Sequence, residues 1–322
     1  MKRIQTLLLI ICVCAMVNIT TAHAEDGIEP ERHDFSVHIF YPLSTTETPA
    51  DFSYINASLI YGRIGEVRGI DLSHGFSRVS GDMRGVQASN CVTYVGGELW
   101  GVSGTGIASL VSGDIRGVQS AGLLSWTGGD VYGVQTSGIV NVAGEVNGVQ
   151  AGLVNISRQM NGVPIGLINI SENGGVQMSG WYSSLTEANT GLRFRAGNFY
   201  SLFAFGFTGT DYSGLSETVD STRIISHSFA LGASIPVGFL RLNMDAGILN
   251  IDRQRFYEID EDHDRWGVRY RGMIELPLFG GVSVFGGVGA SYLVDAKEEP
   301  TEEDFVNGEW EELYFIGAGI EL

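Results

Sequence analysis

The chain has 322 residues and a formal net charge of −18, and it contains 45 glycines but only 7 prolines. The acidic balance argues against nucleic acid as a partner, because contacts to phosphates need Lys and Arg, and against attachment to anionic lipid through basic patches. Glycine at about twice its usual share of ~7% disfavours helices and favours turn-rich β structure.

The first 24 residues have the three parts of a secretory signal. Lys2 and Arg3 form a positive start, Leu7–Val17 form an apolar run, and Ala22-His23-Ala24 forms a small-x-small cleavage site. The run is shorter than the ~20 residues of a membrane helix, and no later segment is long and apolar enough to be one. We expect residues 1–24 to be removed on export. Any membrane span of the mature chain must then be a closed barrel.

Two strands are predicted within residues 25–64, at Phe35–Tyr41 and Phe52–Ile60. They either join a membrane barrel formed by the C-terminal half, giving it ten strands, or cap the open end of a repeat array, as such arrays require. The barrel is the favoured alternative, and it would return the chain to the periplasmic side before the repeat begins.

A repeat of 16 residues fills residues 65–174. Each unit resembles Gly81-Asp82-Met83-Arg84-Gly85-Val86, and its second glycine recurs at 69, 85, 101, 117, 133, 148 and 162. Five columns of side chains repeat with it. The first aliphatic column is Val67, Met83, Leu99, Ile115, Val131, Val146 and Met160; the second is Ile70, Val86, Val102, Val118, Val134, Val149 and Val163; the third is Cys91, Ile107, Leu123, Ile139, Leu153 and Leu167. The glutamine column is Gln87, Gln119, Gln135 and Gln150, and the polar column is Thr93, Ser109, Ser125, Asn141, Asn155 and Asn169.

These columns indicate a stack of coils. Identical residues in stacked coils give aliphatic layers inside and ladders of side-chain amides along the stack. A unit this short cannot close its own core, so its neighbours must stack on it. We predict a Gly-rich β-solenoid of about seven coils, about 30 Å long at ~4.8 Å per coil. The alternative is that each unit is one membrane strand of a larger barrel, although up-and-down strands would then place identical turns on opposite sides of the membrane.

After Gly175 the repeat gives way to two-residue alternation. Leu240–Ile248 is an example, in which apolar residues alternate with Arg241, Asn243 and Asp245. Apolar-out, polar-in strands are typical of outer-membrane barrels. We predict about eight strands in residues 175–322, at 176–185, 190–197, 199–208, 223–235, 239–251, 267–278, 282–294 and 312–322. Short turns alternate with long polar segments, and the even number ends the chain on the side of the short turns, which is the periplasmic side.

The last predicted strand places Tyr314, Ile316, Ala318 and Ile320 on one face and ends at Leu322. It resembles the C-terminal signal that the bacterial barrel-insertion machinery recognises, with Leu322 in place of the usual Phe. We therefore expect outer-membrane lipid and this machinery as partners. The residues expected in the aromatic belts at the membrane surfaces are Trp181, Tyr182, Tyr200, Tyr270 and Tyr292.

The repeat resembles a family of bacterial outer-membrane surface-repeat proteins with GVQxGLxN-type repeats. The resemblance is carried by Gly148-Val149-Gln150-Ala151-Gly152-Leu153-Val154-Asn155, by Gly162–Asn169 and by the lead-in Phe40-Tyr41-Pro42-Leu43-Ser44. It covers most of the mature chain. It implies an outer-membrane location and this architecture, and it implies no reaction.

The sequence offers few candidates for chemistry. Asp260, Asp262 and Asp264 place carboxylates at alternate positions, as calcium loops do, but Arg265 stands where an EF-hand needs glycine. They are candidates for divalent-metal binding, with a hydrated acidic loop as the alternative. His263 is the one candidate for a catalytic group, and no G-x-S-x-G or H-E-x-x-H motif accompanies it. We expect no enzyme activity and no cofactor.

The predicted fold class is therefore all-β, with a Gly-rich β-solenoid followed by an antiparallel outer-membrane-type β-barrel. The predicted function is a non-enzymatic surface or structural protein of the cell outer membrane, anchored by its barrel, with the solenoid for contact or scaffolding. One alternative is a passive pore or transport barrel in which the repeats supply extra membrane strands. Another is a barrel enzyme with a loop active site. Strand parity places the repeats on the periplasmic side, which conflicts with a surface role.

Overall fold

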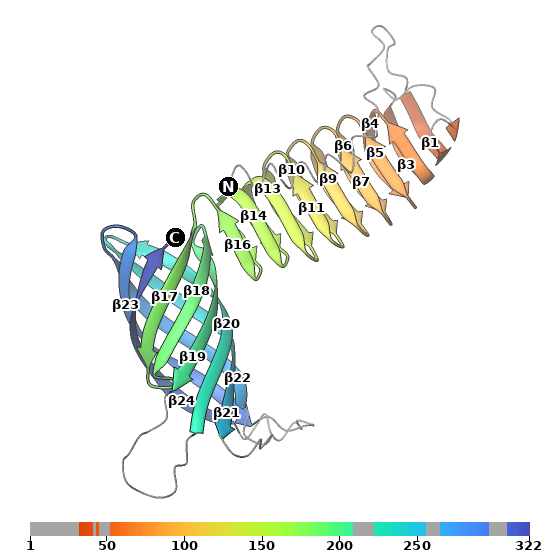
Figure 1. Cartoon of the computed structure of the whole chain (residues 1–322). Coiled ribbons are helices and arrows are strands. Elements are labelled where there is room, and N and C mark those ends of the chain that lie inside the picture. The colour runs from red at the N-terminus through yellow and green to blue at the C-terminus, as the bar shows by residue number, and fades with distance from the viewer. Residues whose placement is uncertain (1–31, 41–42, 45–51, 209–221, 256–264, 296–307) are drawn as a thin grey trace, which may run out of the picture.

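The computed structural model describes residues 32–40, 43–44, 52–208, 222–255, 265–295 and 308–322. These residues form a stack of parallel coils and a closed antiparallel barrel, joined at one end of the barrel (Figure 1). Every described element is a strand, so the all-β prediction is confirmed. Within the described ranges no helix has the length and apolarity to cross a membrane. The predicted secretory signal lies outside them.

The repeats form a solenoid with two parallel ladders of strands. The first ladder contains β4 (Glu66–Ser73), β6 (Met83–Ser89), β8 (Leu99–Thr105), β10 (Ile115–Ala121), β12 (Val131–Ser137), the second half of β13 (Val140–Ala151) and β15 (Val163–Ile165). The second contains β5 (Phe76–Val79), β7 (Val92–Val95), β9 (Ala108–Val111), β11 (Leu124–Thr127), the first half of β13, β14 (Val154–Met160) and β16 (Ile168–Ser171). Successive units pair in parallel with a register of one repeat, as Gly101, Gly117 and Gly133 do. The alternative in which the units are up-and-down membrane strands is therefore wrong.

The two N-terminal strands belong to the solenoid. β1 (Arg32–Phe40) pairs in parallel with β3 (Phe52–Ile64), and the short β2 (Leu43–Ser44) pairs with β1. β3 in turn pairs with both β4 and β5 and so connects the two ladders. The favoured expectation that these strands join the barrel is wrong, because β3 already follows the register of the first coil and β1 adds to its open edge.

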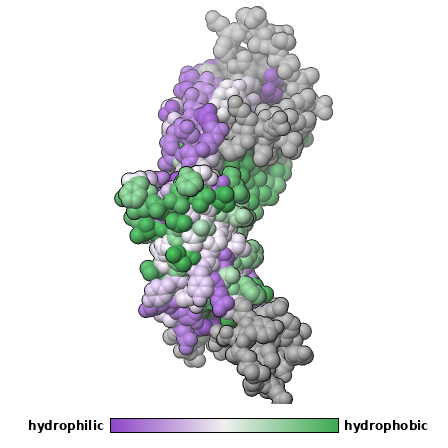
Figure 2. All heavy atoms as spheres, turned by 60° about the vertical axis from the view of Figure 1, so that its left-hand side comes forward, coloured by the Kyte–Doolittle hydropathy of each residue, from purple (hydrophilic) through white to green (hydrophobic). Residues whose placement is uncertain are grey.

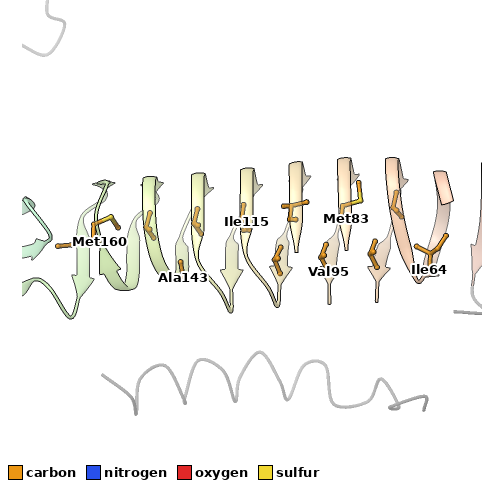
Figure 3. Packing of buried hydrophobic residues seen from close by; sticks show 13 residues of the cluster. Ile64, Met83, Val95, Ile115, Ala143 and Met160 are labelled. Carbon is orange, nitrogen blue, oxygen red and sulfur yellow. The ribbon is translucent and has the colours of Figure 1, made fainter. Parts of the chain in front are cut away.

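Only the first aliphatic column lies inside the stack. Its members from Val67 to Val146 have no exposed surface, and they form one apolar core with Val79, Val95 and Val111 of the second ladder (Figure 3). The expectation that the other two aliphatic columns are also internal is wrong. The second column follows the first by three positions, and alternate residues of a strand point to opposite faces, so it must point outward.

The glutamine and polar columns fill the rest of the interior. Their side chains have 0–1% exposed surface. Gln150 donates to Gln135 (2.8 Å) and Gln135 to Gln119 (3.0 Å), while Asn141 donates to Asn155 (2.9 Å). The predicted amide ladders are thus present, and they run inside the stack, where each buried amide finds a partner one coil away.

The second glycine of each unit is required by the stacking. Gly117 has φ of 140°, and a Cβ there would lie 2.0 Å from the carbonyl oxygen of Gly101 in the preceding coil. A side chain would push the coils apart, so this position accepts only glycine.

The C-terminal half is a closed barrel of eight antiparallel strands. They are β17 (Gly175–Ser183), β18 (Ala188–Ala196), β19 (Phe199–Thr208), β20 (Thr222–Val237), β21 (Leu240–Arg255), β22 (Arg265–Pro277), β23 (Val282–Asp295) and β24 (Glu309–Glu321). The barrel closes where β17 pairs with β24, for example at Trp181 and Gly317. The prediction of eight strands with this order is confirmed.

The solenoid meets the barrel at the end with the short turns. The turns after β18, β20 and β22, the first residue of β17 and the end of β24 all lie at this end (Figure 1). Strands β19, β21 and β23 run away from it. The last residues of β19, β21 and β23 and the first residues of β20, β22 and β24 therefore lie at the opposite end of the barrel.

The side chains of the barrel alternate as predicted. Met244 and Ile248 of β21 point outward, while Asn243 and Asp245 are buried in the lumen. Two of the residues expected in aromatic belts face inward instead, because Trp181 and Tyr200 are only 7% and 1% exposed. Both occupy the alternate positions that face the lumen. The other three, Tyr182, Tyr270 and Tyr292, are exposed or half-buried.

Candidate functional site

The lumen of the barrel is filled by its own charged side chains near the end where the solenoid attaches. Glu275 of β22 is completely buried and pairs with Arg193 of β18 at 3.1 Å. Gln177 and Asn243 each donate to the same carboxylate at 2.9 Å. Three strands besides β22 thus converge on one acidic side chain, so the carboxylate is both paired and hydrogen-bonded, as a buried charge must be.

A second buried ion pair lies deeper in the lumen. The guanidinium of Arg271 donates to both oxygens of Asp245, at 2.9 and 3.0 Å, in a bidentate pair. The hydroxyl of Tyr200 donates to Asp245 at 2.9 Å. Arg193 lies over the Tyr200 ring, 4.6 Å from its centroid, and so connects the two ion pairs. Each of these charged groups has a partner of opposite charge in the lumen, and the buried Arg269 of β22 donates to the hydroxyl of Ser228 at 2.7 Å.

Apolar side chains close the lumen further from the solenoid. Trp181, Phe285 and Phe315 pack together, with ring centroids 6.4 and 6.5 Å apart, and Arg271 lies over two of these rings. A further cluster of Leu249, Ile251 and Leu293 is buried beyond them. Layers of ionic and aromatic side chains therefore cross the barrel, as expected for eight strands, which enclose only enough space for their own side chains.

The turn between β18 and β19 caps the open end of the solenoid. Ala196 is 1% exposed and belongs to the apolar core of the solenoid together with Met160. Gly197 follows with φ of 58°, and a Cβ there would lie 2.3 Å from the carbonyl oxygen of Met160. The barrel turn thus covers the last aliphatic layer, which would otherwise be exposed to solvent.

The polar ladder also continues into the barrel. Asn155 donates to Asn169 at 2.8 Å, and Asn169 lies 3.4 Å from the hydroxyl of Ser201 in β19. Ser201 in turn donates to the backbone oxygen of Leu167 at 2.7 Å. Both the apolar and the polar halves of the solenoid interior therefore end on β18 and β19, which positions the solenoid on the barrel.

A buried carboxylate occupies the glutamine column near the far end of the solenoid. Asp71 accepts hydrogen bonds from Asn56 (2.7 Å), Ser77 and Gln87 (2.9 Å) and has no exposed surface. Burial raises the pKa of Asp71, and the three hydrogen bonds oppose that change. Burial also lowers the pKa of the nearby His38 imidazole. Asp71 and His38 are both enclosed in the stack, with 0% and 1% exposed surface.

The candidates for metal binding and catalysis are not placed by the structure. Asp260, Asp262, His263 and Asp264 lie outside the described residues. Within the described residues, no group of three or more His, Cys, Asp or Glu side chains is arranged to hold a metal ion. The lumen network was not anticipated as a unit. Its signal was present in the sequence, because Asp245, Arg271 and Glu275 occupy inward positions of strands that alternate strictly.

No known protein family and no curated protein matches this chain. Among solved structures it is similar to a major outer membrane protein from Thermus thermophilus, with 11% identity, a TM-score of 0.30, and coverage of 46% of this chain and 99% of that one. It is also similar to the Yersinia pestis outer membrane protein Ail in a phospholipid nanodisc, with 15% identity, a TM-score of 0.29 and coverage of 46% and 99%. The crystal structure of Ail gives 12% identity, a TM-score of 0.23 and coverage of 46% and 95%.

Proposed function

We propose that the chain is a non-enzymatic outer-membrane protein whose barrel is a closed anchor and whose solenoid is a scaffold on the periplasmic side. The observation that carries this proposal is the contrast between the two faces of the barrel wall. The inner face holds buried charged side chains, four of which form two ion pairs, and the outer face holds aliphatic and aromatic side chains.

The outer face of the barrel is suited to lipid. Met244, Ile248, Tyr270, Ile274 and Ile316 all point outward and are more than half exposed. An apolar surface that surrounds a whole barrel far exceeds the few hundred Å² that soluble monomers expose, which supports a membrane environment. Outer-membrane lipid is thus the first expected partner.

The filled lumen supports an anchor in preference to a pore. The ion pairs Arg193–Glu275 and Arg271–Asp245 cross the lumen and are almost fully buried. A conducting path would have to break them, which leaves buried charges without partners at a cost of about 3–5 kcal/mol for each pair. The alternative of a passive pore also needs the repeats as additional barrel strands, and they form a separate stack.

The topology supports the periplasmic side for the solenoid. Outer-membrane barrels keep their short turns in the periplasm and their long loops outside. The solenoid, the turns after β18, β20 and β22 and the end of β24 all lie at the same end of this barrel, whereas the short turn after β17 lies at the opposite end. We propose that the barrel-insertion machinery recognises β24, which ends next to Leu322. The solenoid then serves as a scaffold in the periplasm, and the conflict with a surface role is removed.

Gel mobility and conductance together test this proposal. In the outer-membrane fraction, the unboiled protein is expected to migrate differently from the boiled protein, because a closed barrel resists detergent until it is heated. In planar bilayers the purified full chain is expected to give no nanosiemens-scale steps. A soluble protein without a mobility shift would contradict the barrel anchor, and regular large steps would contradict the filled lumen.

A further inference from the structure

One edge of the solenoid is apolar and exposed along its length. The turns that lead from the first ladder to the second carry the third aliphatic column, whose backbones are hydrogen-bonded from coil to coil. Five consecutive members, which we call the apolar edge, are each 39–49% exposed: Ile107, Leu123, Ile139, Leu153 and Leu167. With coils ~4.8 Å apart, they form a straight row of about 20 Å. The outward-facing second column runs beside this row.

The charged residues of these coils lie on the opposite edge. Between Gly101 and Ser171 the charged residues are Asp114, Arg116, Asp130, Glu145 and Arg158, and they lie in or beside the turns that lead back to the first ladder. Asp130 accepts from the backbone N–H of Glu145 at 2.8 Å and pairs with Arg158 at 3.4 Å. The solenoid is therefore amphipathic about its long axis. Figure 2 shows hydrophilic residues on one side of the solenoid and hydrophobic residues on the other.

The apolar edge is continuous with the outer wall of the barrel. A groove of about 640 Å³ lies between Leu153 and Leu167 of the solenoid and Phe229 and Leu231 of β20. A second groove, of about 610 Å³, lies between Ile165 of the last coil and outward-facing side chains of the barrel that include Met244. The last coil therefore lies beside the part of the wall that the proposed function exposes to lipid.

The apolar surface of the barrel also reaches the very end at which the solenoid attaches. The short turns there carry Phe239 and Phe279, which are 77% and 89% exposed, next to the exposed Val237 and Leu278. Outer-membrane barrels carry girdles of aromatic side chains at both membrane–water interfaces. The interfacial layer thus extends to the level of the coils nearest the barrel.

The apolar edge ends before the far end of the stack. In the two coils that lie further from the barrel than Ile107, the third aliphatic column continues as the half-buried Cys91 and as Gly75. Beside them, Asn90 and His74 form a side-chain hydrogen bond of 2.9 Å. The row of large aliphatic side chains is therefore confined to the five coils nearest the barrel.

We propose that the apolar edge lies in the interfacial layer of the periplasmic leaflet, so that the solenoid lies against the membrane in which its barrel is anchored. The occupant of the edge is the boundary between lipid headgroups and acyl chains, and the charged edge faces water. The inference rests on the proposed transmembrane barrel, which supplies the lipid surface beside the last coil. Burial of a straight aliphatic row in this layer follows the same physics as an interfacial amphipathic helix.

Quenching by brominated lipid tests the proposal on the full chain. Single cysteines carrying a bimane fluorophore are placed in a Cys91→Ser background at three positions, Leu123→Cys on the apolar edge, Tyr132→Cys towards the charged edge, and Ile248→Cys on the barrel wall. Leu123 and Tyr132 are 49% and 41% exposed, so they are matched in access to solvent. Each protein is reconstituted into phosphatidylcholine–phosphatidylglycerol vesicles with or without chain-brominated phosphatidylcholine. Leu153→Cys serves as a second position on the same edge.

The expected result is that bromine quenches the probes at 123, 153 and 248 to a similar fraction and leaves the probe at 132 unchanged. Quenching at 248 without quenching at 123 and 153 overturns this inference and leaves the barrel anchor intact. Absence of quenching at 248 overturns the proposed function and this inference with it. Oxidative cross-linking of Leu123→Cys between two chains, at a yield independent of dilution into lipid, would show that a second copy covers the edge and would also overturn the proposal.

Discussion

Removal of one rung of the internal glutamine ladder should destabilise the solenoid strongly. Gln135 is completely buried, donates to Gln119 and Thr127 at 3.0 Å each, and accepts from Gln150 at 2.8 Å. The variant Gln135→Ala removes these hydrogen bonds, together with the one that Gln135 donates to the backbone oxygen of Val142 at 3.1 Å, in the buried interior of the stack. Each buried polar group left without a partner costs about 1–3 kcal/mol.

The magnitude follows from which partners are left unsatisfied. Gln119 still accepts from Thr127 at 3.0 Å, so its loss is partial. Gln150 keeps only a long contact of 3.4 Å to the backbone oxygen of Ile156. We therefore expect Gln135→Ala to lower the free energy of unfolding by about 2–4 kcal/mol. The control is Val134→Ala, one residue away on the outward face, for which we expect about 1 kcal/mol or less.

The assay is urea unfolding of the full chain in detergent micelles, followed by circular dichroism and by proteolysis of the solenoid, with the heat-dependent gel shift as a check that the barrel is intact. If Gln135→Ala and Val134→Ala unfold at the same urea concentration, the ladder does not stabilise the interior and the account of the solenoid core is refuted.

Three further predictions concern the far end of the solenoid, the junction and the lumen. Because burial raises the pKa of Asp71, its contribution to stability is largest at low pH and is lost as the pH rises through the folded-state pKa. Asp71→Gln, which extends the amide ladder, should flatten the dependence of the free energy of unfolding on pH in this range, measured by urea unfolding. An unchanged dependence on pH would show that Asp71 does not cause it. Gly197→Val should loosen the junction and so speed cleavage after Glu172 by a glutamyl protease, because the added Cβ would lie 2.3 Å from the carbonyl oxygen of Met160. The control is Gly238→Val, which should leave the cleavage rate unchanged. Gly238 has a similar φ of 62°, and a Cβ there would have no atom within 4 Å. Glu275→Ala leaves Arg193 buried without its partner and should destabilise the barrel by about 3–5 kcal/mol, seen as a gel shift at lower temperature, and an unchanged shift temperature would refute the role of this ion pair.

The architecture was predictable from the sequence because two periodic patterns of residues, one in each half of the chain, indicate it. The 16-residue repeat favours stacked coils, and strict alternation in segments such as Leu240–Ile248, together with short turns between long polar segments, favours a barrel wall with two different faces. The eight predicted strands agree with the observed ones to within a few residues. Their inward charges, including Asp245 and Glu275, were visible in the sequence as polar residues that alternate with the apolar ones. Which of them pair could not be predicted, because the pairs join strands far apart in sequence.

The side to which the second aliphatic column of the solenoid points was predicted incorrectly, although the spacing of the residues along the strand already determines it. Met83 and Val86 are three residues apart in one strand, so they must point to opposite faces, and Met83 and Gln87 must share a face. Hydrophobicity alone placed Val86 inside, and the strand geometry places Gln87 there instead. The placement of β1 and β3 was missed for a different reason, because short alternating strands fit either a barrel or a solenoid end.

The most direct test of the account is the side of the membrane on which each end of the molecule lies. In cells that carry the protein in a Cys91→Ser background, Tyr132→Cys places a thiol on the solenoid, and Glu187→Cys places one at the opposite end of the barrel, in the exposed turn between β17 and β18. A membrane-impermeant maleimide should label Glu187→Cys in intact cells and Tyr132→Cys only after the outer membrane is permeabilised. Labelling of Tyr132→Cys in intact cells would place the solenoid on the cell surface and contradict the account.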